Sequence, residues 1–157
     1  MDLGITGRTA LVTGASTGLG LASAQALAAE GVRVALASRS ADKLDAALAT
    51  VAGDPVAVTA DLADDASIDA MLAEVADALG HVDILVANAG GPPPGTFAST
   101  DVDLYPAALQ LNLLAHVRMC KALIPPMRER GWGRVVAITS ATVREPSPDL
   151  RPITASL

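Results

Sequence analysis

Three glycines between residues 14 and 20 form the stretch with the clearest chemical meaning. The segment Val12-Thr13-Gly14-Ala15-Ser16-Thr17-Gly18-Leu19-Gly20 follows an apolar run and precedes an alanine-rich one, which is the pattern of a strand, a tight turn and a helix. Such a turn aims backbone N–H groups at an anion, and the helix dipole favours negative charge there. Glycine permits positive φ and lets a phosphate approach the backbone. We therefore expect a phosphate-binding loop, in which Gly18 and Gly20 pack closely against a strand or a ligand.

The spacing of these glycines narrows the class of phosphate site. It is Gly-x-x-x-Gly-x-Gly, whereas the commonest dinucleotide fingerprint is Gly-x-Gly-x-x-Gly. No Lys-Ser/Thr pair follows the last glycine, which excludes a P-loop. A simpler reading stays open, because any turn between a strand and a helix can use glycine. Residues elsewhere in the sequence are needed to decide which phosphate-containing ligand this loop would bind.

Ser38 and Arg39 follow the second apolar run of the sequence. In a dinucleotide site this position meets the adenosine ribose, where an acid would bind the 2′-hydroxyl and a basic residue would accommodate a 2′-phosphate. Arg39 suits planar, bidentate recognition of phosphate. The pair therefore favours NADP(H) over NAD(H). The alternative is that Arg39 is a solvated surface arginine. The preference for NADP(H) is also weakened because the glycine loop has Thr17 where a second basic residue could stand.

Polar residues also follow the next three apolar runs, and one more lies in a long helix. Asp61-Leu62 follows the third run, Asn88-Ala89-Gly90 the fourth and Ser140 the fifth, while Asn112 lies in the helix. Asp61 could instead be a helix N-cap, Ser140 a turn residue and Asn112 a satisfied core amide. Asn88 can brace the sheet through side-chain bonds to neighbouring backbone. Loops that converge on the carboxyl edge of one parallel sheet predict a shared site.

Taken in order, these motifs resemble the short-chain dehydrogenase/reductase family over the whole chain. The loop Thr13-Gly14-x-x-x-Gly18-x-Gly20 is similar to the family's cofactor loop. Asn88-Ala89-Gly90 is similar to its Asn-Asn-Ala-Gly motif, with Ala87 in the position of the first asparagine. The resemblance implies hydride transfer between a nicotinamide cofactor and a small carbonyl or alcohol substrate, in which the protein orients the cofactor that does the chemistry.

The resemblance also implies a role for each polar residue. Asp61 would hold the adenine amino group with Leu62 packed beside it, and Ala89-Gly90 would leave room for the cofactor ribose. Asn112 would hold a water of the proton relay through its backbone, and Ser140 would bind the substrate carbonyl oxygen as the catalytic serine. The predicted cofactor-binding set further includes Gly14, Ser16, Thr17, Gly18, Leu19, Gly20, Ser38, Arg39 and Asn88.

One part of the family pattern is missing from this sequence. The family has a Tyr-x-x-x-Lys motif on the helix after the serine, in which the lysine lowers the pKa of a phenol that is otherwise about 10. The corresponding segment, residues 153–157, has neither residue, and the only tyrosine, Tyr105, begins a different helix. We therefore expect a fragment of a longer gene product or a natural truncation.

In the family, further helices and strands follow the fifth strand and build the substrate pocket, and this sequence does not contain them. Without them we expect an exposed surface. The fifth strand would become an edge with unpaired backbone groups, and Val135, Val136 and Ile138 would lack their usual cover. Self-association would hide this surface. In the family, the long helix that carries Asn112 also forms a dimer contact. We therefore expect a homo-oligomer.

Strands and helices alternate along the sequence. Apolar runs predict strands over 8–13, 32–37, 56–60, 82–87 and 134–139, and periodicity predicts helices over 19–30, 41–51, 64–79 and 104–130. Ser40 is the expected N-cap of the second helix, Pro125-Pro126 should kink or fray the end of the last one, and residues 90–95 and 146–152 should be irregular. This order predicts a single α/β domain over 1–157, with a Rossmann-like, doubly wound parallel sheet truncated after about the fifth strand.

Composition restricts the class of function. Aromatic residues make up 2% of the 157 residues, so Ala, Val and Leu must fill the core. The net charge of −6 argues against a nucleic-acid partner. No signal peptide or membrane-spanning run is found, and the lone Cys120 cannot form an internal disulfide, so we expect a cytoplasmic protein. No Cys/His cluster has the spacing of metal ligands, so no metal is expected.

Three hypotheses remain. The first is an NADP(H)-dependent oxidoreductase in which Ser140 polarises the substrate oxygen. The second is a dinucleotide-binding module or inactive homologue without catalysis, which the missing Tyr and Lys favour. The third is a nucleotide-sugar or S-adenosylmethionine enzyme on the same architecture, because fold does not determine function. Ser38-Arg39 lacks the acid that would support the third.

Overall fold

The computed structural model describes residues 2–91, 96, 98–140 and 144. Five strands form one sheet in the order β3-β2-β1-β4-β5, and every neighbouring pair is parallel. The predicted α/β fold with a Rossmann-like parallel sheet is therefore confirmed. The strands are β1 (Thr9–Thr13), β2 (Arg33–Ser38), β3 (Val56–Thr59), β4 (Ile84–Ala87) and β5 (Arg134–Ala137).

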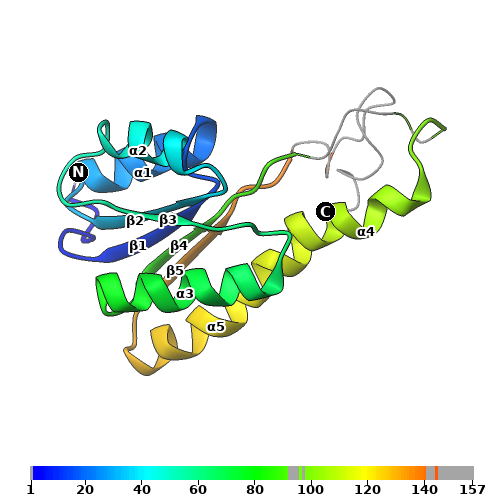
Figure 1. Ribbon diagram of the computed structural model, residues 1–157. Coiled ribbons are helices and arrows are strands. Elements are labelled where there is room, and N and C mark those ends of the chain that lie inside the picture. The colour runs from blue at the N-terminus through cyan, green and yellow to red at the C-terminus, as the bar shows by residue number, and fades with distance from the viewer. Residues whose placement is uncertain (1, 92–95, 97, 141–143, 145–157) are drawn as a thin grey trace.

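Helices cover both faces of the sheet. Figure 1 shows α1 (Gly18–Ala29) and α2 (Ala41–Leu48) on one face and α3 (Asp65–Leu79) and α5 (Ala115–Glu129) on the other. Successive side chains of a strand point to opposite faces, so Leu11 of β1 joins the core under α3 and α5, whereas its neighbour Val12 joins the core under α1 and α2. Both cores consist of small and medium apolar side chains, as the scarcity of aromatic residues predicts.

Helix α2 begins where the sequence predicts and ends earlier. The Ser40 hydroxyl accepts a hydrogen bond from the Lys43 N–H at 3.4 Å, so the predicted N-cap is confirmed. The backbone then tightens into a turn, with Thr50 N donating to Ala47 O at 2.9 Å. The helix therefore stops at Leu48 instead of residue 51.

The segment predicted as one helix over 104–130 is divided. A 3-10 turn, η1 (Val102–Leu104), and α4 (Tyr105–Leu109) lead into a single π-helical turn, η2 (Gln110–Leu114), before α5 begins. Pro125 and Pro126 lie inside α5, and the helix continues beyond them to Glu129. The expected fraying is therefore wrong, because Met127 is buried and its carbonyl accepts the N–H of Trp132 at 3.1 Å, which anchors the last turn.

Strand β5 forms one edge of the sheet and, within the described residues, pairs with β4 alone. The exposed fractions of Val135 and Val136 are 40% and 51%, so the expected lack of cover is confirmed for both. Ile138 differs, because it is half-buried and packs against the core under α1 and α2. None of the helices in the described part of the chain is both long enough and apolar enough to span a membrane.

Candidate functional site

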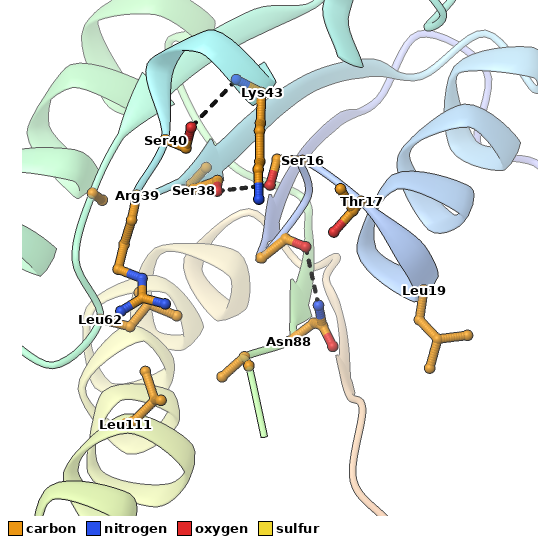
Figure 2. Close-up of a pocket in the computed structure, with 15 residues that line it drawn as sticks. Ser16, Thr17, Leu19, Ser38, Arg39, Ser40, Lys43, Leu62, Asn88 and Leu111 are labelled. Carbon is orange, nitrogen blue, oxygen red and sulfur yellow. Dashed lines mark hydrogen bonds between the residues drawn. The ribbon is translucent and has the colours of Figure 1, made fainter. Parts of the chain in front are cut away.

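A cavity of about 460 Å³ lies at the carboxyl ends of the central strands. In this sheet order the strand sequence reverses between β1 and β4, and such a switch point is where ligands bind in open parallel sheets. Residues that follow β1, β2, β3 and β4 converge on this cavity, as the sequence predicts, whereas Ser140 after β5 is not among its lining residues (Figure 2). The lining residues are Gly14, Ser16, Thr17, Leu19, Ala37, Ser38, Arg39, Ser40, Lys43, Ala60, Leu62, Asn88, Ala89, Gly90 and Leu111.

Each glycine of the loop is required for a different reason. Gly14 has φ of +58°, and a Cβ there would lie 2.6 Å from Asn88 Nδ2. A Cβ on Gly20 would collide with the carbonyl oxygen of Gly14, so the predicted close packing is confirmed for Gly20. Gly18 has φ of +57°, and no atom of the described residues lies within 4 Å of the place that a Cβ would take, so the glycine is needed there for its backbone conformation. Neither Gly18 nor Gly20 is a lining residue of the cavity.

Asn88 braces the site, as the sequence predicts. Its Nδ2 donates to Thr13 O at 3.3 Å and to Gly14 O at 3.2 Å. In return, the Thr13 hydroxyl donates to Asn88 O at 2.8 Å and accepts from Asn88 N at 3.0 Å. Thr13 is fully buried, and its role was not predicted from the sequence. Together the two residues join the end of β1 to the end of β4.

Positive charge gathers at the β2 side of the cavity. Arg39, directly after β2, is exposed at the cavity wall, and Lys43 of α2 lines the same cavity. Between them the Ser38 hydroxyl lies 2.9 Å from the Ser16 hydroxyl, which ties the glycine loop to β2. The presence of Lys43 in the cavity lining was not predicted from the sequence. Its position three residues after the Ser40 cap does indicate that it lies in the first turn of α2.

Asp61 does not line the cavity. Its Oδ1 accepts the N–H of Ala63 at 2.9 Å, and its own N–H donates to the Ser67 hydroxyl at 2.9 Å. The alternative reading of Asp61 as a helix N-cap is wrong, because Asp64 caps α3 by accepting the N–H of Ala66 at 3.1 Å. Leu62 does line the cavity, as predicted.

Asn112 and Ser140, the two predicted catalytic residues, lie outside the cavity lining. Asn112 sits in the π-helical turn η2, and its Nδ2 donates to Ala108 O at 3.0 Å within the helix. Single π-helical turns are frequent at functional sites, and Leu111 in the same turn lines the cavity. Ser140 is half-buried and follows β5, which ends at Ala137, earlier than the predicted residue 139.

Several segments with a predicted role lie outside the described residues. They are most of the Gly/Pro-rich segment, at 92–95, the proline-rich tail at 146–152 and the segment at 153–157 that corresponds to the Tyr-x-x-x-Lys position. Tyr105 is described and begins α4, as predicted, and it does not line the cavity.

Comparison with known proteins agrees with this architecture. A family model described as short chain dehydrogenase matches residues 8–156. Ketoacyl reductase HetN of Nostoc sp. is 37% identical over 139 residues, which are 87% of this chain and 48% of that protein. The L-sorbose reductase of Gluconobacter frateurii, solved with NADPH and L-sorbose, is 33% identical with a TM-score of 0.91, and the match covers 99% of this chain and 60% of that one.

A third similar protein also contains a nicotinamide cofactor. Actinorhodin polyketide ketoreductase, solved with NADPH, is 34% identical with a TM-score of 0.86 over 99% of this chain and 61% of that one. The chain therefore spans about half the length of the curated relatives it matches and about 60% of these solved structures.

Proposed function

Because the chain belongs to the short-chain dehydrogenase family, we propose that its cavity binds a nicotinamide dinucleotide and prefers NADP(H) to NAD(H). The observation that carries the proposal is the pairing of a glycine loop and Arg39 on opposite walls of one cavity. The glycine loop fits a pyrophosphate, because Gly14, Ser16 and Thr17 line the cavity where α1 begins, and the backbone N–H groups and dipole at a helix N-terminus favour an anion. Arg39 fits a 2′-phosphate, because its guanidinium is exposed at the wall.

The other lining residues support the same orientation. Leu62, which follows β3, would pack beside the adenine, and Ser38 would lie near the adenosine ribose. Ala89 and Gly90, after β4, would leave room for the second ribose and bring the nicotinamide ring toward η2. Asp61, directly before Leu62, would hold the adenine amino group, because its Oδ1 accepts the N–H of Ala63 and a carboxylate has further acceptor sites.

The reaction that we propose is hydride transfer with a small carbonyl or alcohol substrate. The bound cofactor supplies or accepts the hydride. Ser140 would donate a hydrogen bond to the substrate oxygen, and the backbone of Asn112 would hold a water nearby. The similar L-sorbose reductase supports this substrate class, because its structure contains NADPH together with a keto sugar. The alternative is a dinucleotide-binding module without catalysis, which the absence of Tyr-x-x-x-Lys from the sequence favours.

A calorimetric titration of the 157-residue chain with NADPH and NADH tests the cofactor proposal. We expect NADPH to bind more tightly, and Arg39→Ala to weaken NADPH binding by at least about tenfold while NADH binding stays the same, because only NADPH offers a charge-assisted contact there. Arg33→Ala, at the opposite end of β2, is the control. Failure of both dinucleotides to bind would refute the proposal. Binding without NADPH oxidation by any of a panel of ketones would favour the module over the enzyme.

We also propose that a second copy of this chain covers the exposed face of β5. A groove of about 510 Å³ runs beside this strand, lined by Ile124 and Met127 of α5 and by Trp132 and Val135. Ile124 and Val135 line this groove and are both exposed, which is unusual for apolar side chains that share one groove. The free edge of β5 adds backbone groups that a second strand can pair with.

Sedimentation equilibrium tests this self-association. We expect a mass of at least twice the 15.8 kDa of one chain. Val135→Lys should shift the mass to that of a monomer, because a charge cannot be buried in an apolar contact without a partner. Val102→Lys, on η1, is a control at another exposed valine and should leave the mass unchanged. A wild-type chain that is monomeric at high micromolar concentration would contradict the proposal.

A cytoplasmic location is part of the same proposal. Its support is the single cysteine of the sequence, Cys120, which is free and half-buried, as is usual for a thiol in a reducing compartment.

A further inference from the structure

We propose that Lys43 is a second cation for the 2′-phosphate end of the cavity and acts with Arg39 to set the preference for NADP(H). The inference rests on the proposed dinucleotide function and deepens it, because it assigns cofactor discrimination to a residue outside the glycine loop and outside the end of β2. Lys43 lines the cavity together with Ser16, Ser38 and Arg39.

The local structure of α2 places Lys43 at this position. The Ser40 hydroxyl caps the helix by accepting the Lys43 N–H, which sets where the first turn begins. Leu44, the next residue, is buried in the core under α1 and α2, which sets the rotation of the helix about its axis. Figure 2 shows the Lys43 side chain extended toward Ser16 and Ser38, with Arg39 on the other side of Ser38.

The charge of Lys43 is available to a ligand. Among the residues that the structure describes, neither Lys43 nor Arg39 forms an ion pair, whereas Arg33, Arg118 and Arg130 each pair with an aspartate. Two unneutralised cations at one cavity wall stand out in a chain of net charge −6. The positive end of the α2 dipole lies at the same place and adds to the attraction for an anion.

A 2′-phosphate is suited to two different cations. A phosphate monoester carries a charge of about −1.5 to −2 at neutral pH, so a single arginine leaves part of it uncompensated. Arg39 offers a planar fork, while Lys43 offers a compact ammonium group with three donors. The glycine loop has the uncharged Thr17 and supplies no cation of its own. Lys43, on α2, provides the second positive charge for the 2′-phosphate, which the glycine loop does not supply.

Isothermal titration of Lys43→Gln tests the inference. We expect this variant to bind NADPH and the fragment 2′,5′-ADP about tenfold more weakly than the wild type, and to bind NADH equally well, because only the first two carry the 2′-phosphate. The matched control is Lys121→Gln, which removes the only other lysine of the sequence, an exposed one on α5. It should change none of these affinities. Both lysines are exposed, so neither substitution should impair folding.

Chemical labelling of amines gives a second, independent readout. With only two lysines in the chain, mass spectrometry can compare their acetylation directly. Saturating NADPH should protect Lys43 more than NADH does, and Lys121 should be labelled equally in all samples.

Two results would overturn the inference, and they differ in what else they overturn. If the wild type prefers NADPH and Lys43→Gln either retains that preference or weakens NADPH and NADH equally, Lys43 does not read the 2′-phosphate and the proposed function stands. If the wild type binds neither dinucleotide, the proposed function fails and the role of Lys43 fails with it.

Discussion

Replacing Gly20 with alanine is expected to destabilise the chain by about 3 kcal/mol and to abolish dinucleotide binding. The added Cβ would collide with the Gly14 carbonyl oxygen, and it would also lie 2.8 Å from the Gly14 carbonyl carbon and 2.9 Å from Asn88 Nδ2. These atoms cannot move aside, because Asn88 already donates to Gly14 O and to Thr13 O. Overpacking of this kind typically costs about 1–3 kcal/mol. The beginning of α1 must shift, and the phosphate-binding loop shifts with it.

Urea unfolding and NADPH titration together test this prediction. The control is Gly53→Ala, because Gly53 also has a positive φ, of +79°, and faces open space. The control should lose about 1 kcal/mol from its unfavourable backbone conformation and retain NADPH binding. An unfolding midpoint and NADPH affinity of Gly20→Ala equal to those of the wild type would show that the loop tolerates the extra atom.

Replacing Asp83 with alanine is expected to lower the free energy of unfolding by about 2–3 kcal/mol without changing NADPH affinity. The Asp83 carboxylate is 3% exposed and lies 3.3 Å from His81, 3.8 Å from Arg8 and 3.8 Å from Arg130. It also accepts the N–H of Thr9 at 3.4 Å. Breaking a buried ion pair costs about 3–5 kcal/mol when the partner charge stays buried. Here the partners are about one-third exposed or more and can return to water, which reduces the loss.

The comparison that isolates this effect is Asp54→Ala. Asp54 pairs with Arg33 at 3.2 Å, but its side chain is 85% exposed, so its removal should leave the unfolding midpoint unchanged. Trp132 fluorescence can follow both transitions, because the guanidinium carbon of Arg8, a partner of Asp83, lies 4.1 Å from the centroid of the indole ring. Equal effects of the two substitutions would show that burial of Asp83 contributes nothing. NADPH affinity should persist because Asp83 lies at the amino edge of the sheet, opposite the cavity.

The strands and the shared edge could be predicted from the sequence because both follow from local patterns. Apolar runs ended by glycine or a short polar side chain indicate buried strands, and parallel order then brings residues such as Ser38 and Asn88 to one edge. The bracing by Asn88 could be predicted for the same reason, since a polar side chain at that edge has few partners other than backbone.

The remaining features depend on packing, which the sequence alone does not show. Lys43 enters the cavity only because the buried Leu44 sets the rotation of α2. The π-helical turn around Asn112 and the continuation of α5 through Pro125 arise where tertiary contacts outweigh local propensity. Asp61 and Asp64 are equally good N-caps by type, and only the structure distinguishes them. Thr13 and Asp83 lie within apolar runs, so their roles become visible only when strands are paired.

The reciprocal bonds between Thr13 and Asn88 also bear on the kinetics of folding. They join residues 75 positions apart in the chain, so the cavity forms only after a large loop has closed. Contacts of such long sequence separation slow folding. During synthesis, β1, β2 and β3 leave the ribosome well before β4, and in that interval the glycine loop lacks its brace. A ligand that requires the braced loop therefore cannot guide these early steps, and its stabilisation acts by slowing the unfolding of a chain that has already folded.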